Sequence, residues 1–323
     1  MMWATRRAAL AAPITAMAGP TQAQATWPQP GRPITLIVPY APGGGVDTSA
    51  RMIAAGMEKE FPVPVQVLNR PGAGSQIGAT ELVRARPDGH TLLWGVLPTL
   101  ATHYLDPTRG ARYTAADFQP VALHHVSPVV FAVRADSRFR TLREMVEAAR
   151  AAPESVSIST SGLMATPHLG ILMLQQETGA RFTSVHFTGG PPSVTALVGG
   201  HVDAVAGGTS DVASQFASGA FRVLGTTGDG PEPLLPGVAT LRAQGFDVVV
   251  ASAGGMLAPA GTPMPVVEQL SEAMRRIMAQ PGYAERLRQF GLEPAHQGPA
   301  AYAAYWARDE ARMRPIMAAV AGG

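Results

Sequence analysis

Short apolar runs alternate with amphipathic stretches along most of the chain. Residues 34–38, 63–68 and 91–95 are brief runs rich in Val, Ile and Leu, as expected of buried strands. Between them, residues 48–60 and 78–86 carry apolar side chains at helical spacing. Strands that alternate with helices in this way usually form parallel sheets, so the pattern predicts an α/β fold.

The same order continues through the middle of the chain. Residues 129–133 predict a further strand, and Thr141 with Glu144 forms a capping box that opens the next helix. Three strand–loop–helix units follow, with their strands at residues 155–160, 184–187 and 202–206. Later in the chain, Thr262 and Pro263 are residue types preferred at the N-cap and the first position of a helix.

The strongest local feature is the glycine-rich loop between the first predicted strand and helix, Pro42-Gly43-Gly44-Gly45-Val46-Asp47. Glycines let the backbone approach a ligand closely, and the free N–H groups of a helix start can hold an anion. Asp47 can cap the helix or accept a hydrogen bond from a ligand. A tight turn with an N-cap explains the loop equally well without any ligand. A dinucleotide or phosphate-loop motif is absent, which argues against a nucleotide site.

Further polar loops follow the later predicted strands. They contain Ser161 and Gly162, Thr166 to His168, Thr188 with Gly189, and Thr209. Loops of this kind gather at the carboxyl edge of an open α/β sheet, where ligands bind. Because they offer hydroxyl and N–H groups and contain no arginine, they predict a small anion held by dipoles. His168 taken alone is better explained as a histidine at a helix start that faces solvent.

Composition narrows the possible classes of protein. A chain of 323 residues exceeds what one hydrophobic core usually supports, so two domains are expected. With 46% hydrophobic and 15% charged residues, most of the chain should be folded rather than disordered. The absence of cysteine excludes disulfides, thiolate metal sites and cysteine nucleophiles. Lys59 is the single lysine, so any Schiff-base chemistry would depend on it alone.

Catalytic motifs are also missing from the sequence. Residues 250–254 lack the first glycine of a Gly-x-Ser-x-Gly elbow, and no His-Glu-x-x-His occurs. His124 and His125 are adjacent, and on a strand they would point to opposite faces, which argues against a paired-histidine metal site. We therefore predict no catalytic residue, no metal site and no cofactor.

The first 25 residues are typical of a secretory signal peptide. Arg6 and Arg7 precede the mostly apolar run 8–19, and Ala23-Gln24-Ala25 predicts cleavage after Ala25. The arginine pair leaves open whether export uses the general or the twin-arginine route. Removal of this segment leaves 23 basic and 23 acidic side chains, so no nucleic-acid partner is expected. No later apolar run is long enough to span a membrane.

Several motifs in a fixed order give the chain a family resemblance. From about residue 27 to residue 315 it resembles the tripartite tricarboxylate transporter receptors, the Bug family. The resemblance rests on Val38-Pro39-Tyr40-Ala41-Pro42 with the glycines that follow, Asn69-Arg70-Pro71-Gly72-Ala73-Gly74, Pro87-Asp88-Gly89-His90, Gly189-Gly190-Pro191, Gly199-Gly200-His201-Val202-Asp203 and Ala258-Pro259-Ala260-Gly261-Thr262-Pro263.

The resemblance implies an α/β periplasmic binding protein of type II, with two α/β domains around a ligand cleft. The first domain would comprise residues 26–126 and 228–323, and the second residues 127–227. Family members hold small carboxylates in this cleft, and closure is a hinge motion that the ligand stabilises. The expected partners are a small carboxylate and the membrane components of a tripartite tricarboxylate-type transporter, and we expect a monomer.

The resemblance also suggests which residues bind the ligand. We expect contacts from Tyr40, Gly43, Gly44, Gly45, Asp47, Ser161, Gly162, Thr166, His168, Thr188, Gly189, Asp203 and Thr209. Four positions depart from the family pattern: Leu163 and Met164 replace small or polar residues, Thr188 replaces a usual lysine, and Ser252 replaces a usual tryptophan. These departures suggest a carboxylate with an apolar or aromatic body. A sensor module that signals ligand occupancy, or a periplasmic enzyme on the same scaffold, remains an alternative.

Overall fold

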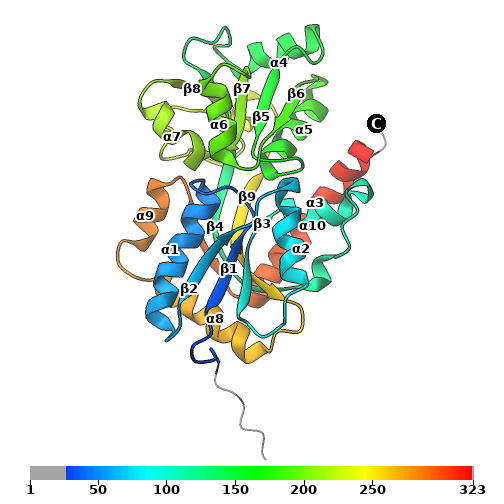
Figure 1. Ribbon diagram of the computed structural model, residues 1–323. Coiled ribbons are helices and arrows are strands. Elements are labelled where there is room, and N and C mark those ends of the chain that lie inside the picture. The colour runs from blue at the N-terminus through cyan, green and yellow to red at the C-terminus, as the bar shows by residue number, and fades with distance from the viewer. Residues whose placement is uncertain (1–26, 322–323) are drawn as a thin grey trace, which may run out of the picture.

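The computed structural model describes residues 27–321, which form two lobes stacked one above the other (Figure 1). The predicted signal peptide lies outside the described residues. The lower lobe contains β1 (Ile34–Val38), β2 (Val65–Asn69), β3 (Thr91–Leu97), β10 (Glu293–Gln297), α1 (Gly45–Glu60), α2 (Gln76–Val83), α3 (Thr99–Leu105), α8 (Met264–Met278), α9 (Tyr283–Gln289) and α10 (Pro299–Ala321). The upper lobe contains β5 (Ser157–Thr160), β6 (Thr183–His186), β7 (Ala204–Gly208), β8 (Phe221–Thr226), α4 (Leu142–Ala151), α5 (Thr166–Thr178), α6 (Gly190–Val198) and α7 (Thr209–Ala217).

Two long strands, β4 (Phe118–Arg134) and β9 (Ala251–Pro259), run between the lobes and join their sheets (Figure 1). The path of paired strands is β2-β1-β3-β9-β4-β7-β5-β6, and β8 and β10 also pair with β4. The pairs of β1 with β2 and β3, and of β5 with β6 and β7, are parallel, as the alternating pattern predicts. The predicted α/β architecture of two lobes is therefore confirmed.

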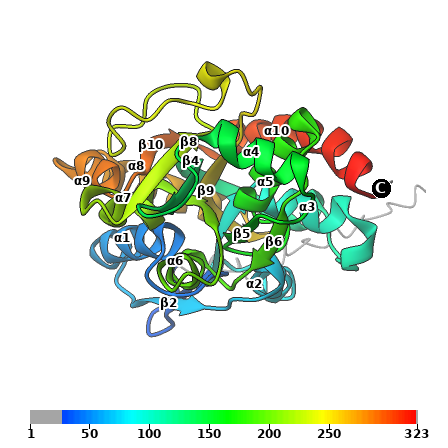
Figure 2. The ribbon, with the colours of Figure 1, turned by 90° about the horizontal axis from the view of Figure 1, so that it is seen from above.

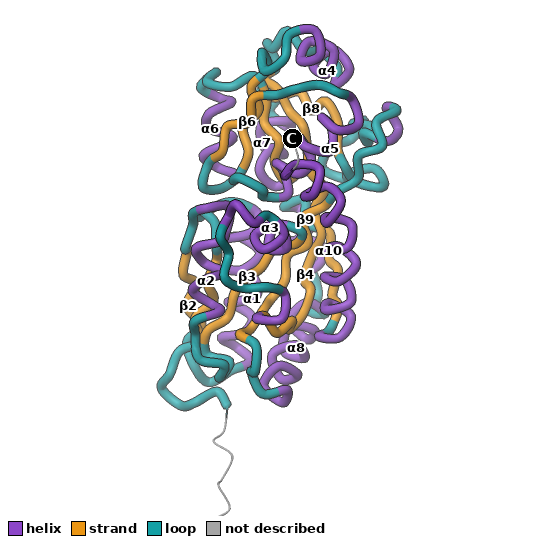
Figure 3. The backbone as a smooth tube through the Cα atoms, turned by 90° about the vertical axis from the view of Figure 1, so that its right-hand side faces the viewer, coloured by secondary structure: helices purple, strands orange, loops and turns teal. Residues whose placement is uncertain are grey.

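Each lobe has helices on both faces of its sheet. In the lower lobe, Ile53 and Leu270 pack on one face, while Leu100 and Tyr302 pack on the other. The side chains of Ala50, Ile53 and Met57 share one face of α1 and are fully buried in the core between α1 and α8. Helix α10 runs along one side of the lower lobe and continues beside the upper lobe (Figure 3). There its Met313 side chain is buried against upper-lobe residues.

The second crossing between the lobes comes later in the chain than expected. The family resemblance places residues 228–250 in the first domain. Four apolar side chains of this segment instead lie in an upper-lobe core with Phe131: Leu241, Phe246, Val248 and Val250. We therefore propose that the second domain extends to about residue 250, where β9 begins. The sequence does not show that this segment belongs to the second domain, because its apolar side chains have no regular spacing.

The bounds of most predicted elements agree with the structure to within a few residues. The capping box of Thr141 and Glu144 is present at the start of α4. Helix α1 begins at Gly45, three residues earlier than predicted, because the last glycine already adopts helical geometry. Helix α8 begins at Met264, with Pro263 as its N-cap residue. The predicted strand 129–133 is the upper part of β4, whose lower part carries Pro120 and two histidines that obscure the strand pattern.

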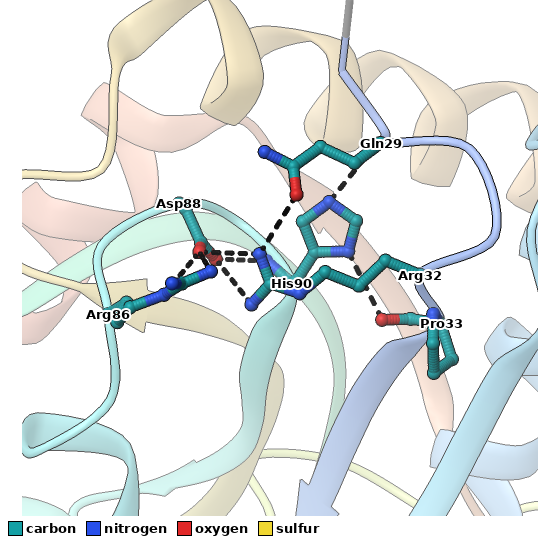
Figure 4. A network of polar contacts seen from close by, with 6 residues as sticks. All are labelled: Gln29, Arg32, Pro33, Arg86, Asp88 and His90. Carbon is teal, nitrogen blue, oxygen red and sulfur yellow. Dashed lines mark hydrogen bonds and ion pairs between the residues drawn. The ribbon is translucent and has the colours of Figure 1, made fainter.

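A polar network fixes the first described residues to the base of the lower lobe (Figure 4). Arg32 Nη1 donates to Asp88 Oδ2 at 2.7 Å, and the His90 backbone N–H donates to Asp88 Oδ1 at 3.1 Å. His90 Nε2 accepts from the Gln29 N–H at 3.1 Å, so Nδ1 carries the proton and donates to Pro33 O. The Pro87–His90 motif therefore serves to anchor the chain, far from the junction of the lobes.

The prediction that His124 and His125 point to opposite faces is wrong. The register between β4 and β9 shifts between Leu123 and His125, and this irregularity turns both rings to the same side. His124 Nδ1 lies 2.9 Å from His125 Nδ1, and His124 Nε2 lies 2.8 Å from the Tyr283 hydroxyl. Both rings are buried beside Trp94. Burial lowers the pKa of both, that of His125 to about 3.

These neutral buried histidines predict a loss of stability in acid. The unfolded chain takes up protons below about pH 6.5 while the folded rings stay neutral, so the stabilisation is complete above that pH and decreases toward about pH 3. For His125 alone we expect a loss of roughly 3 kcal/mol in the free energy of unfolding between pH 6.5 and pH 4. Urea titrations across this range should show a smaller pH slope for His125→Gln than for the unmodified protein. His201→Gln, at an exposed position, is the matched control, and an equal slope in all three would contradict the prediction.

Candidate functional site

A cavity of about 60 Å³ lies at the junction of the two lobes. Tyr40, Gly44 and Gly45 line it from the lower lobe, and Ser161, Thr166 and Asp211 line it from the upper lobe. Ser127 of β4 and Ser252 of β9 contribute hydroxyl groups from the crossing strands. Both lobes and both crossing strands therefore contribute residues to one cavity.

The glycine-rich loop is held in place by Asp47. Its Oδ2 accepts from the Gly43 N–H at 3.0 Å and from Arg51 Nε at 2.9 Å, and its Oδ1 accepts from Asn69 Nδ2 at 2.9 Å. Burial alone would raise the pKa of Asp47, but these hydrogen bonds outweigh it and lower the pKa. The carboxylate is thus already fully engaged, and Asp47 is a positioning residue for the loop.

Direct hydrogen bonds connect the lobes around the cavity. The Ala41 N–H donates to Thr188 O at 2.9 Å, and Thr102 Oγ1 donates to Met164 O at 3.1 Å. Thr99 Oγ1 accepts from the Thr166 N–H at 2.9 Å and lies 3.0 Å from Thr166 Oγ1. These contacts belong to a closed arrangement of the two lobes, because each joins residues that would separate if a hinge opened.

Glycine is required where the lobes meet most closely. A Cβ atom added to Gly45 would collide with Ser210, and one added to Gly44 would lie 3.2 Å from Pro191 Cδ. A Cβ on Gly189 would lie 3.0 Å from the Ala41 side chain, and Gly189 also has φ +155°. The glycines therefore leave room for the starts of α1, α6 and α7 to lie close together. Figures 1 and 2 show where these three helices lie at the junction of the lobes.

The structure brings most of the predicted residues to the junction. Six line the cavity: Tyr40, Gly44, Gly45, Asp47, Ser161 and Thr166. Gly162 and Thr188 line an adjoining cavity of about 170 Å³ together with Tyr40 and Ser161. Gly43 and Gly189 lie where the lobes touch.

Three of the predicted residues line neither of these two cavities. Asp203 is at the opposite end of β7 from the cavity, where its Oδ2 accepts from the Ser157 N–H and hydroxyl, so the structure does not place it in the site. It precedes its strand, and the ligand edge is formed by residues that follow strands. Thr209 is buried and donates to Glu232. His168 does not face solvent: its Nδ1 accepts from the Met164 N–H at 3.1 Å.

The sequence pattern missed several residues that line the cavity. Ser210 and Asp211 directly follow Thr209, so the same loop signal extended by two residues would have found them. Ser127 and His125 lie on β4, where no motif marks them. Leu163 and Met164 are expected to shape the pocket: Leu163 lines the adjoining cavity, whereas Met164 lines neither. Met164 instead packs against Met313 of α10.

Metal-binding clusters and membrane-spanning helices are absent from residues 27–321. Across that range, no group of three or more His, Asp or Glu side chains is arranged to hold a metal ion. None of the helices described there is both long and apolar enough to cross a membrane.

Comparisons with known proteins agree on one family. Residues 49–321 match the model of the tripartite tricarboxylate transporter family receptor. A protein from the tcbD–tcbE intergenic region of Pseudomonas sp. (strain P51) is 35% identical over 299 residues, covering 91% of this chain and 88% of that protein.

Solved structures give the same result. MatC from Rhodopseudomonas palustris with bound malate is 29% identical, with a TM-score of 0.83, and the match covers 89% of this chain and 99% of that one. Another R. palustris protein, with adipate, is 26% identical, with a TM-score of 0.85 and coverage of 92% and 99%.

The contact between Thr99 and Thr166 predicts that two cysteines at these positions will form a disulfide. The two hydroxyls are 3.0 Å apart, and the chain contains no other cysteine to compete. Oxidised Thr99→Cys/Thr166→Cys protein should lose two hydrogens by mass spectrometry and migrate faster than its reduced form on a gel. Each single variant is the control. A pair that stays reduced under oxidant would show that the lobes do not meet there.

Proposed function

Because this chain belongs to the tripartite tricarboxylate transporter receptor family, we propose that it captures a small carboxylate between its lobes and delivers it to the membrane components of such a transporter. The chain is a periplasmic solute-binding receptor rather than an enzyme. Relatives of the same fold carry malate and adipate, which supports a carboxylate ligand here. We further propose that the receptor acts as a monomer and is exported by the segment 1–25, with cleavage after Ala25.

The observation that carries this proposal is the convergence of helix starts on one cavity. Helix α1 begins at Gly45, α5 at Thr166 and α6 at Gly190, and all three residues line the cavity. Ser210, in the first turn of α7, lines it as well. The first N–H groups of a helix have no partner within the helix and carry a partial positive charge, which favours an anion. In α5 and α6 the prolines at positions 167, 191 and 192 lack an N–H, so these two helices act mainly through their dipoles.

The arrangement also explains how a ligand would favour closure. Helices α5, α6 and α7 belong to the upper lobe and α1 to the lower, so an anion between them contacts both lobes only when these are closed. A ligand shifts a conformational equilibrium by its extra affinity for one state. The closed, occupied receptor would then be the form that the membrane components recognise.

Gly45→Ala tests whether ligand binding needs this close approach. Alanine is compatible with the helical backbone at position 45, but its Cβ would meet Ser210 and hold the lobes apart. Isothermal titration calorimetry with malate, adipate, citrate, benzoate, L-aspartate and L-glutamate identifies a ligand for the unmodified mature protein. We expect Gly45→Ala to bind that ligand at least about tenfold more weakly, a loss of about 1.4 kcal/mol or more.

Gly230→Ala is the matched control, because no atom lies within 4 Å of a Cβ added there. Its affinity should equal that of the unmodified protein, and thermal midpoints should confirm that both variants fold. Undiminished binding by Gly45→Ala would contradict ligand capture by closure at this junction. Failure of every acid in the panel to bind would overturn a carboxylate as the ligand.

A further inference from the structure

A carboxylate of the protein itself already occupies part of the cavity. Asp211 lies in the first turn of α7, and its Oδ2 accepts from the Gly208 N–H at 3.0 Å. A Cβ added to Gly44, which directly precedes α1 in the other lobe, would lie 3.5 Å from Asp211 Oδ1. A Cβ on Gly190, the first residue of α6, would collide with the same group. Asp211 therefore sits where three helix starts meet.

No positive side chain balances this charge. Among the cavity-lining residues that the structure describes there is neither arginine nor lysine. The other acidic residue in the lining, Asp47, is paired with Arg51. His125, which also lines the cavity, is neutral because burial lowers its pKa. The position at which the family pattern has a lysine is Thr188, whose carbonyl accepts from Ala41.

The surroundings of Asp211 make its negative charge costly. Burial raises the pKa of Asp211 to about 6, although the backbone N–H groups of Gly208 and Gly45 act in the opposite direction. A second carboxylate brought to the same helix starts would be repelled, since like charges in an enclosed site strongly disfavour each other. A protonated nitrogen placed there would instead form a charge-assisted hydrogen bond to Asp211.

Building on the proposed function, we infer that the ligand is an amino-substituted carboxylate whose protonated nitrogen pairs with Asp211. Its carboxylate then lies beside Ser161 and Thr166, which line the cavity from the upper lobe and carry hydroxyl groups. Asp211 is thus a specificity-determining residue that selects against unsubstituted dicarboxylates. The positive and the negative group of such a ligand each meet a complementary group in the cavity, so no cationic side chain is required.

The inference is tested with pairs of acids that differ only by an amino group. Isothermal titration calorimetry at pH 7.5 compares L-aspartate with succinate, L-glutamate with glutarate, and L-2-aminoadipate with adipate, using the mature protein. In the best-fitting pair we expect the amino acid to bind at least about tenfold more tightly. In Asp211→Asn, which keeps the shape and removes the charge, this preference should disappear and the amino acid should lose at least about tenfold in affinity.

Asp136→Asn is the matched control, since Asp136 is exposed on the upper lobe and paired only with Arg134. It should retain the unmodified preference. If Asp211→Asn fails to fold, the comparison of each acid pair on the unmodified protein still decides the question. Equal or tighter binding of the unsubstituted acid would overturn the inference while leaving carboxylate capture intact.

A pH series separates the inference from proton uptake by Asp211. If dicarboxylates bound by protonating Asp211, their affinity would rise about tenfold for each pH unit below 7.5 until the pH approaches 6. The other titratable groups in the cavity lining are Tyr40, Asp47 and His125. Such a rise, with dicarboxylates preferred at pH 6, would also overturn the inference. Absence of binding by every acid at both pH values would overturn the proposed function as well.

Discussion

The close approach of bare helix starts is the constraint on which the rest of the structure depends. Gly44 and Gly45 of the lower lobe lie directly against the side chains of Pro191, Ser210 and Asp211 of the upper lobe. A Cβ on Gly45 would force the start of α1 away from Ser210 of α7, and one on Gly190 would displace Asp211. The glycine-rich loop is therefore needed for the contact between lobes as much as for its own turn.

The loop is rigid because its polar groups are satisfied within the lower lobe. Asp47 accepts hydrogen bonds from Gly43, Arg51 and Asn69, and Asn69 Nδ2 also donates to Tyr40 O. This network joins β1, α1 and the end of β2, so it holds the helix start in place before any ligand arrives. Preorganised dipoles of this kind bind an anion without the cost of ordering the site at that moment.

The cavity combines neutral dipoles with one unbalanced acidic group, and this combination sets its chemistry. Helix starts attract negative charge, whereas Asp211 repels it, so the two together favour a ligand that carries both signs. The serines of β4 and β9 add hydroxyls: Ser127 Oγ donates to Gly291 O at 3.1 Å and can still accept, and Ser252 adds a second hydroxyl. Because these strands connect the lobes, their hydroxyls stay at the base of the cavity whichever way the lobes move.

Local pattern in the sequence determined the α/β class, most helices and strands, and the loops that form the cavity edge. It could do so because apolar periodicity, the capping box of α4 and the glycine-rich loop act through neighbouring residues. The lower part of β4, the crossing at β9 and the placement of Ser127, Ser252 and Asp211 were decided by tertiary structure alone. Their roles depend on strand pairing and on contact between residues far apart in the chain, and a bulge in β4 turned His125 against its expected direction. Asp203 is predicted to bind the ligand but lies at the end of β7 away from the cavity. Only the sheet topology reveals which end of β7 faces the cavity.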